Sequence, residues 1–447
     1  MTITEPPMPG RSPRRWVPAL LGIALFAVAA ALYLGGFTRA FAVLMDALGG
    51  YHKDLPFMDI QSDLAGMECY RRGIDVYVTN PCDVLGRVYN YSPVWLLGGY
   101  LGLGTSGMFV AGVGVDLVFL ASLALLPPAR TWRATVAVVA ATLSNSVVLA
   151  VELANADVIM FVLLLLAGLV ALRPSAIRLM AYPLIVFAAM LKFYPVVAMV
   201  IALRERPVRA VVVVFVALLS LLLFAWIGWT DIMRALHMLP DELDFYMIGA
   251  RSLPYGLQSL YPTVYARLPL SSGALEAILC IIAVGLAIVI ARSREVTGAV
   301  AGLTEAERVF LLLGGTVMVG CFFAGQSFRY RAVFMLFVLP ATTALWFGPY
   351  GRFTTRLFGI TSIGVMLVMW GYYLAQPVLL LADTPPGPGA VGALIKAAFW
   401  FGRELAWWWV ITALLGGVLV VVMRSEVVQA CCDRHGRWTA AKPPAQT

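Results

Sequence analysis

The sequence predicts an all-α polytopic membrane protein, a bundle of about 11–13 transmembrane helices, and three observations lead to this prediction. Hydrophobic residues make up 61% of the 447-residue chain, whereas soluble domains contain roughly 45–50%. Apolar runs close to the ~20 residues that cross a bilayer recur along almost the whole chain. Short connections between these runs carry arginines, as cytoplasmic loops do under the positive-inside rule.

The apolar runs form one long membrane domain at 17–423, between a cytoplasmic N-terminal tail at 1–16 and a cytoplasmic C-terminal tail at 424–447. We expect no regular structure in the second tail, because it is polar and ends in "TAAKPPAQT". No internal repeat is visible in the sequence. The expected spans are 17–36, 107–126, 135–151, 156–172, 179–191, 194–203, 209–229, 274–291, 308–324, 331–347, 356–375 and 405–423.

The first apolar run follows a basic segment and shows no small-residue cleavage site, which indicates a retained first helix with a cytoplasmic N-terminus. If successive spans cross the membrane in alternate directions, every arginine-bearing connection lies on the cytoplasmic side. This result requires that 179–203 is split at "LKFYP" into a short hairpin of two pieces. The run "YSPVWLLGGYLGLG" is apolar but short and rich in glycine, so we expect a re-entrant helix there. The long connections on the outer side are 37–92, 230–272 and 376–404.

Composition and motifs argue against several function classes. The net charge is +8, but 24 acidic residues accompany 32 basic ones and no nucleic-acid-binding motif is present. The sequence lacks a Walker A loop, a GxSxG nucleophile elbow, an HExxH motif and zinc-type cysteine spacing. We therefore expect no nucleic-acid partner, no cofactor and no metal.

Cysteine usage offers one candidate disulfide. Of six cysteines, only Cys69 and Cys82 fall in an outer connection, where an oxidising environment permits a disulfide. The sequence leaves open whether these two residues are bonded or remain free thiols.

Four carboxylates stand just behind the first apolar run, in "PFMDIQSDLAGMECYRRGIDVY", although only 13% of the chain is charged. Asp59 is a candidate general base at the membrane surface, and Asp63, one helical turn further on, is the alternate. The other interpretation is that Asp59 caps a loop helix. Glu68 and Asp75 are expected to pair with Arg71, Arg72 or Arg87.

Two further polar motifs interrupt apolar runs. In "LANADVIMFVLLLLAG", Asn155 and Asp157 either cap a helix or face the 37–92 connection. In "LKFYP", Lys192 is the one base among about two dozen apolar residues, where an ionisable group costs ~2.5–3.5 kcal/mol on insertion unless it snorkels or is paired. Lys192 either snorkels to the interface or binds a lipid phosphate.

Arg329 and Arg331 in "GQSFRYRAVF" lie on the outer side, against the positive-inside rule. Guanidinium groups bind phosphate oxygens as a fork, so an anionic ligand is one explanation. Pairing with loop acids such as Asp59 is the other. The 230–272 connection adds aromatic residues, acids and amides, which suit sugar rings and equally suit an interfacial belt.

The order of these motifs resembles glycosyltransferase family 87, polyprenyl-phosphate-mannose-dependent mannosyltransferases with the multi-pass C-type fold. Asp59, Gly73, Tyr77 and "NYSPVWLL" follow the family's Asp, Gly, Tyr and aromatic–Tyr–Pro–Pro pattern, with Asn90 and Ser92 departing from the turn. "ANADVIMFVLLLLAG" is similar to the family's Gly-Gln-x-Asn helix, "LKFYP" to its Lys-x-x-Pro element, and "SFRYRAVFMLFVLP" to its late Ser/Tyr helix.

The resemblance covers about residues 17–350. It implies a C-type glycosyltransferase-like bundle in the cytoplasmic membrane of a bacterium, with the active site in outer loops that face the periplasm or cell exterior. It also implies transfer of a single sugar, mannose or another hexose, from a polyprenyl-phosphate donor to a lipid or glycan acceptor. No metal is required, because the leaving phosphate already carries its charge.

The resemblance and the motifs together assign roles to residues. Asp59 is the expected base, and Lys192, Arg329 and Arg331 are the expected donor phosphate ligands. The alternatives are a transporter or flippase of lipid-linked sugars and a noncatalytic assembly partner. The expected substrate-binding residues are Tyr77, Tyr91, Asn155, Asp157, His237, Arg251, Gln326 and Tyr330.

Overall fold

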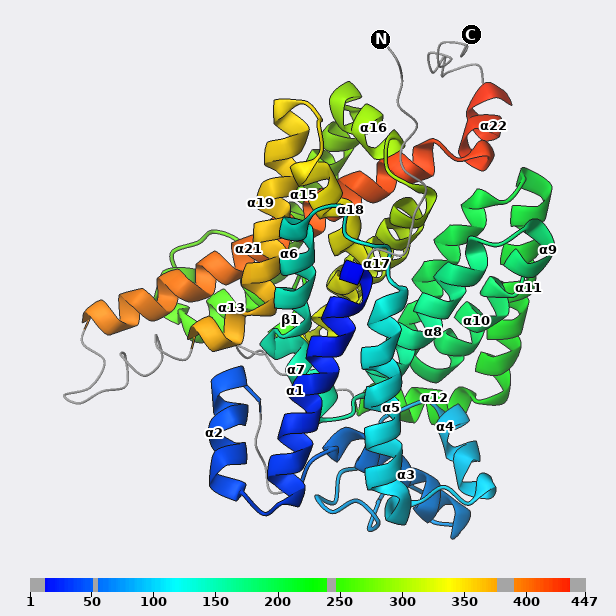
Figure 1. Cartoon of the computed structure of the whole chain (residues 1–447), viewed down its shortest axis with the longest axis vertical. Coiled ribbons are helices and arrows are strands. Elements are labelled where there is room, and N and C mark those ends of the chain that lie inside the picture. The colour runs from blue at the N-terminus through cyan, green and yellow to red at the C-terminus, as the bar shows by residue number, and fades with distance from the viewer. Residues whose placement is uncertain (1–12, 51–54, 239–246, 376–389, 435–447) are drawn as a thin grey trace.

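The chain folds into a bundle of helices (Figure 1). Its two strands in the described residues, β1 (Met247–Ile248) and β2 (Ser327–Phe328), form one short antiparallel pair. The prediction of an all-α polytopic membrane protein is therefore confirmed at the level of fold class. The computed structural model describes residues 13–50, 55–238, 247–375 and 390–434.

Eight helices in this part of the chain are long and apolar enough to cross a membrane. A ninth span results if α6 (Trp132–Thr142) and α7 (Asn145–Glu152), which meet at a 44° bend, cross as one. The predicted number of about 11–13 is higher, because α8 (Ala156–Ala171), α10 (Ala181–Lys192) and the 3₁₀-helix η5 (Tyr194–Arg204) are short. Three of the eight spans include flanking 3₁₀ turns: Arg14–Leu34 contains α1 (Val17–Leu34), Thr105–Leu125 contains α5 (Met108–Ser122), and Arg329–Phe347 contains α18 (Met335–Phe347). The other five are α11 (Pro207–Ile227), α15 (Ser272–Arg292), α17 (Glu305–Ala324), α19 (Arg352–Met369) and the span Val391–Met423 of α21 (Ala390–Met423).

Helix α10 and η5 form the predicted hairpin, which turns at Phe193. The Tyr182 hydroxyl near the start of α10 donates to Glu205, just behind η5, over 3.0 Å, so the two arms run antiparallel. The 12 residues of α10 span ~18 Å and the 11 residues of η5 span ~22 Å. Both arms are shorter than the ~30 Å hydrocarbon core. Lys192 at the tip therefore lies within the thickness of the bundle.

The described part of the 37–92 connection and the segment behind it build the end of the molecule opposite to α16 (Arg294–Ala301) and α22 (Glu426–Arg434) (Figure 1). The connection contains two helices, α2 (Thr38–Leu48) and α3 (Met58–Arg71). The expected re-entrant segment is a broken helix made of α4 (Pro93–Leu96) and the 3₁₀-helix η2 (Leu97–Leu101). It is fixed to the end of α10, because the Trp95 indole N–H donates to the Leu191 carbonyl over 3.0 Å.

Arginines from the predicted inner connections gather at the other end. Arg130 pairs with Glu307, and Arg204 pairs with Glu305, so both contact the start of α17. The Arg424 guanidinium donates to the Thr297 carbonyl over 3.1 Å. These residues thus share one end of the fold, as the charge pattern predicts.

Two expectations for the C-terminal third were wrong in part. The 376–404 connection is helical from residue 390 onward as the first half of α21, and 376–389 lies outside the described residues. The tail begins with a helix, α22 (Glu426–Arg434), so its first part has regular structure.

The remaining helices are η1 (Pro13–Trp16), η3 (Thr105–Gly107), η4 (Leu123–Leu125), α9 (Ser175–Arg178), α12 (Trp229–His237), α13 (Ser252–Leu260), α14 (Pro262–Tyr265), α16 (Arg294–Ala301) and η6 (Arg329–Phe334).

Packing separates a buried centre from an apolar periphery. Helix α18 is almost completely buried, with Phe334, Phe337 and Phe161 of α8 stacked at its start. In contrast, α11 exposes large apolar side chains such as Phe215 and Trp226. Exposed apolar faces of this extent suit contact with lipid chains, because the surrounding solvent is then itself apolar.

Candidate active site

The site begins at a hydrogen bond between two segments almost 100 residues apart. The Asn155 side-chain amide donates to the Asp59 carboxylate over 2.6 Å. Asp59 stands in the first turn of α3, and Asn155 is the N-cap of α8. The Asp59 side chain makes no capping hydrogen bond in α3, so the capping interpretation does not explain it.

Backbone contacts fix the start of α3 against the end of α7. The Phe57 and Asp59 N–H groups donate to the carbonyls of Glu152 and Leu153, at 2.8 and 3.1 Å. Phe57 and Ala154 are the two non-glycine residues of the described part with positive φ, at 61° and 44°. Such conformations cost energy and often occur at functional sites. The catalytic candidates Asp59 and Asn155 each follow one of these strained positions.

Asn155 is oriented by bonds on both sides of its amide. Its oxygen accepts the Asp157 backbone N–H at 2.8 Å, which confirms the predicted cap. The same oxygen accepts from the Lys192 ammonium at 3.3 Å. The amide nitrogen is thereby directed at Asp59. The predicted cap is thus confirmed, and Asn155 also faces Asp59 of the 37–92 connection, while its role in substrate binding stays a prediction.

Behind Asn155 lies a buried charge cluster. The Lys192 ammonium is 2.6 Å from the Asp157 carboxylate, and the Arg331 guanidinium is 3.3 Å from its other oxygen. The Tyr194 hydroxyl donates to the same carboxylate over 2.8 Å. Asp157 is completely buried, whereas Lys192 and Arg331 keep 12% and 16% of their side chains exposed. Behind Asn155, the buried Asp157 carboxylate thus holds two partly exposed cations, Lys192 and Arg331.

Aromatic rings surround the Lys192 ammonium. It lies 5.4 Å from the centre of the Tyr91 ring and 5.8 Å from that of Tyr330. The Arg331 guanidinium lies over the Tyr194 ring, 4.6 Å from its centre. Cations held against ring faces are stabilised without losing their charge. Lys192 is thus paired and does not simply snorkel away from the bundle.

Arg87 belongs to the site, although the sequence suggested only a loop pairing for it. Its guanidinium lies 3.6 Å from the Asp59 carboxylate and 3.0 Å from Asp83. It also donates to the Met58 carbonyl over 2.6 Å. Of the other loop acids, Glu68 pairs with Arg72 as expected, whereas Asp75 pairs with Arg234 of α12.

The two candidate bases differ in access and in acidity. The Asp59 side chain is 17% exposed, whereas Asp63 is completely buried and its carboxyl oxygens have no partner among the described residues. Burial raises the pKa of Asp59, while the Asn155 hydrogen bond and the charges of Arg87 and Lys192 oppose the rise. Burial and the nearby negative charge of Asp59 raise the pKa of Asp63 to about 8.

The rest of the 37–92 connection folds over α3. Cys69 and Cys82 form a disulfide, which is the bonded alternative of the two that the sequence left open. The Gln61 amide donates to the Cys82 carbonyl over 3.2 Å. The Tyr77 hydroxyl donates to the Tyr91 carbonyl over 3.3 Å, so Tyr77 supports the aromatic wall from behind.

Four expected site residues have other surroundings. Arg329 lies over the Tyr372 ring, 3.7 Å from its centre, and donates to the Gly49 carbonyl. His237 is exposed at the end of α12, its Nδ1 2.6 Å from the Met233 carbonyl. The Arg251 guanidinium lies 4.8 Å from the centre of the Tyr255 ring. Gln326 precedes β2, and its buried side-chain oxygen has no partner in the described part.

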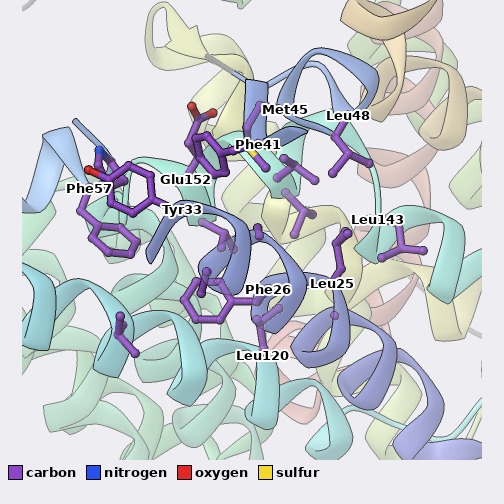
Figure 2. Close-up of a pocket in the computed structure, with 18 of the residues that line it drawn as sticks. Leu25, Phe26, Tyr33, Phe41, Met45, Leu48, Phe57, Leu120, Leu143 and Glu152 are labelled. Carbon is purple, nitrogen blue, oxygen red and sulfur yellow. The ribbon is translucent and has the colours of Figure 1, made fainter. Parts of the chain in front are cut away.

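An apolar pocket of about 120 Å³ lies between α1, α2 and the α3–α7 junction (Figure 2). Helices α1 and α2 line it together with α5 and the α6–α7 pair. Phe57 and Glu152, which join α3 to α7, form part of its wall near Tyr33. The pocket thus reaches the α3–α7 junction that also positions Asp59, although Asp59 itself does not line it.

Among the described residues, no group of three or more His, Cys, Asp or Glu side chains is arranged to hold a metal ion. The chain matches no protein family model, no curated protein and no solved structure. Membership in glycosyltransferase family 87 thus stays a proposal.

Proposed function

We propose that the protein is a membrane glycosyltransferase that moves one hexose, mannose or a relative, from a polyprenyl-phosphate donor to a lipid or glycan acceptor. The reaction takes place at the outer face of the bacterial cytoplasmic membrane. The carrying observation is the contact chain Asp59–Asn155–Lys192–Asp157–Arg331, which joins the Asp59 carboxylate to two cations around Asp157. Four motifs far apart in the sequence supply these residues.

The pair of carboxylates supports Asp59 as the base. Two acids whose surroundings separate their pKa values take different protonation states at neutral pH. With a pKa of about 8, Asp63 is protonated there, and its burial keeps it from a substrate. Asp59 is partly exposed and is stabilised as an anion by Asn155 and Arg87. Asp59 is therefore the carboxylate that can accept a proton.

The positions of the Asp59 carboxylate and of the two cations suggest how the sugar is transferred. Asp59 accepts the proton of the acceptor hydroxyl while the hydroxyl oxygen attacks the anomeric carbon of the donor sugar. The bond from that carbon to the phosphate oxygen breaks, and its electron pair leaves with the polyprenyl phosphate. Lys192 and Arg331 stabilise the additional negative charge on this phosphate. The apolar pocket offers room for the first part of a lipid chain beside the α3–α7 junction.

Sugar transfer by the purified protein from a synthetic polyprenyl-phosphate hexose tests the proposal. Asp59→Asn keeps the size and the polar character of the side chain but removes its basicity, so transfer should fall by at least ~10². Lipid donor should still bind. Loss of transfer in Asp63→Asn, with near-normal turnover in Asp59→Asn, would assign the base to Asp63. If the protein moved the intact lipid-linked sugar across a vesicle membrane without transferring the sugar, the result would support a transporter or flippase instead.

A further inference from the structure

A second cavity, polar and of about 500 Å³, lies at the arginine-bearing end of the bundle. It is lined by the ends of η5, α16 and α21 and by the starts of α17 and α22, of which α22 is seen at the top right of Figure 1. Its polar lining consists of Arg204, Glu305, Arg308, Arg424, Ser425 and Glu426. The remaining lining is largely apolar and includes Leu203, Val300, Val309, Leu312, Val421 and Val422.

The three arginines are held in place by the protein backbone. Arg204, Arg308 and Arg424 each donate through Nη1 to a main-chain carbonyl, of Ala171, Ala301 and Thr297, at 3.1, 2.9 and 3.1 Å. For Arg308 and Arg424, the Nε and Nη2 groups have no hydrogen-bond partner within the described residues. Their guanidinium groups are thus oriented and still carry donors for a ligand.

The charges around the cavity leave a positive excess. Arg204 is paired with Glu305. Glu307, the other acid at the start of α17, faces Arg130 and the Thr304 cap and does not line the cavity. Arg308 and Arg424 therefore remain against the single carboxylate of Glu426. A ligand with one negative charge would neutralise this excess.

We infer that this cavity binds the phosphate ester of an anionic phospholipid headgroup. Guanidinium groups match phosphate oxygens as a fork, and basic pockets between transmembrane helices bind anionic headgroups on the side where arginines accumulate. The apolar wall suits the glycerol and the first methylenes of the acyl chains. The site is separate from the proposed sugar-transfer site, so it does not depend on that proposal.

Native mass spectrometry of the full-length protein in detergent tests the inference. The protein is incubated with equal amounts of phosphatidylglycerol and phosphatidylcholine, and the bound lipids are counted. We expect phosphatidylglycerol to be retained by the wild type and to be reduced at least about tenfold in Arg308→Gln/Arg424→Gln. The matched control, Arg352→Gln/Arg356→Gln, removes the same charge from the start of α19 outside the cavity and should behave as the wild type.

A second arm identifies the source of the phosphate. Excess inorganic phosphate should leave the bound phosphatidylglycerol in place, because only the lipid also contacts the apolar wall. Displacement by inorganic phosphate would overturn the lipid assignment and indicate a soluble phosphate ester. Equal retention of phosphatidylglycerol by the double variant, or equal retention of phosphatidylcholine by the wild type, would overturn the site altogether.

Discussion

Asp63 is a buried carboxyl group, and its contribution to the free energy of unfolding depends on pH. Its pKa is raised from 3.8 to about 8 in the folded protein, mainly by burial. The unfolded chain therefore binds fewer protons between these two values, and stability falls by about 1.4 kcal/mol per pH unit as the pH rises through this window. The stability that neutral Asp63 preserves is complete below the lower value and is lost as the pH passes about 8.

Asp63→Asn should remove most of this pH dependence, because its amide stays neutral throughout. Thermal unfolding in detergent between pH 5 and about 9 measures the effect, with Asp83→Asn as a control at a carboxylate that already pairs with Arg87. An unchanged slope in Asp63→Asn would mean that Asp63 is ionised in the folded protein.

The bases of the charge cluster should act on the donor. Lys192→Ala and Arg331→Ala should each weaken donor binding by ~1.5–3 kcal/mol, the worth of a charge-assisted contact. Arg329→Ala is the matched control, since its guanidinium contacts Tyr372 and Gly49 and should affect stability more than donor affinity. Titration with a polyprenyl phosphate measures the dissociation constants. Equal donor affinity in all variants would leave Lys192 and Arg331 as packing residues.

Sequence alone grouped Arg329 with Arg331, and geometry separates them. Both belong to the 3₁₀-helix η6, in which residues two apart point about 120° away from each other. Arg331 therefore reaches Asp157, while Arg329 turns to Tyr372. Arg87 was missed as a site residue for a related reason. Its partner Asp59 is 28 positions earlier, and only the folded loop brings the two together.

At the scale of elements, the disulfide closes the segment that delivers Arg87 to Asp59. Cys69 lies in the last turn of α3, and Cys82 directly precedes Asp83, so the crosslink restrains the loop segment that runs from α3 to Arg87. A loop of about 14 residues gives ~3 kcal/mol of stabilisation from lost entropy of the unfolded chain.

Cys82→Ser should therefore lower stability by ~3 kcal/mol and reduce transfer, since Arg87 loses its fixed position. Cys280→Ser is the control, because Cys280 is a free thiol in α15. Thermal unfolding and sugar transfer are the measurements. Alkylation of both Cys69 and Cys82 in unreduced native protein would contradict the disulfide itself.

Hydropathy located most of the helices, because a helix in lipid needs a long apolar run. The sequence also predicted the break at "LKFYP", because a lysine interrupts the apolar run there and a single crossing would invert the later connections. Helices α2 and α3 were not predicted as elements, because polar and apolar residues are mixed in them and tertiary contacts hold them. The first half of α21 was taken for a loop, since the prolines before residue 390 hide where the helix starts.

For the whole molecule, the arrangement predicts sidedness. The site and the arginine-bearing connections lie at different ends, so a membrane around the bundle would place them on opposite sides. Single cysteines introduced at Val84 and His237, both exposed at the end of the molecule that carries α3 and α12, should react with an impermeant maleimide outside intact cells. A cysteine at Arg356, exposed at the opposite end, should react only after permeabilisation. External labelling at Arg356, or none at Val84, would reverse the topology.

The apolar pocket between α1 and α2 has a kinetic consequence. Neighbouring apolar side chains such as Leu34 and Val43 are exposed, so a lipid substrate can enter it sideways from the bilayer without passing through water. Encounter is then two-dimensional diffusion, and its frequency is set by the mole fraction of substrate in the membrane. Detergent added to a fixed amount of enzyme and substrate dilutes this surface concentration, so turnover slows although every bulk concentration is unchanged.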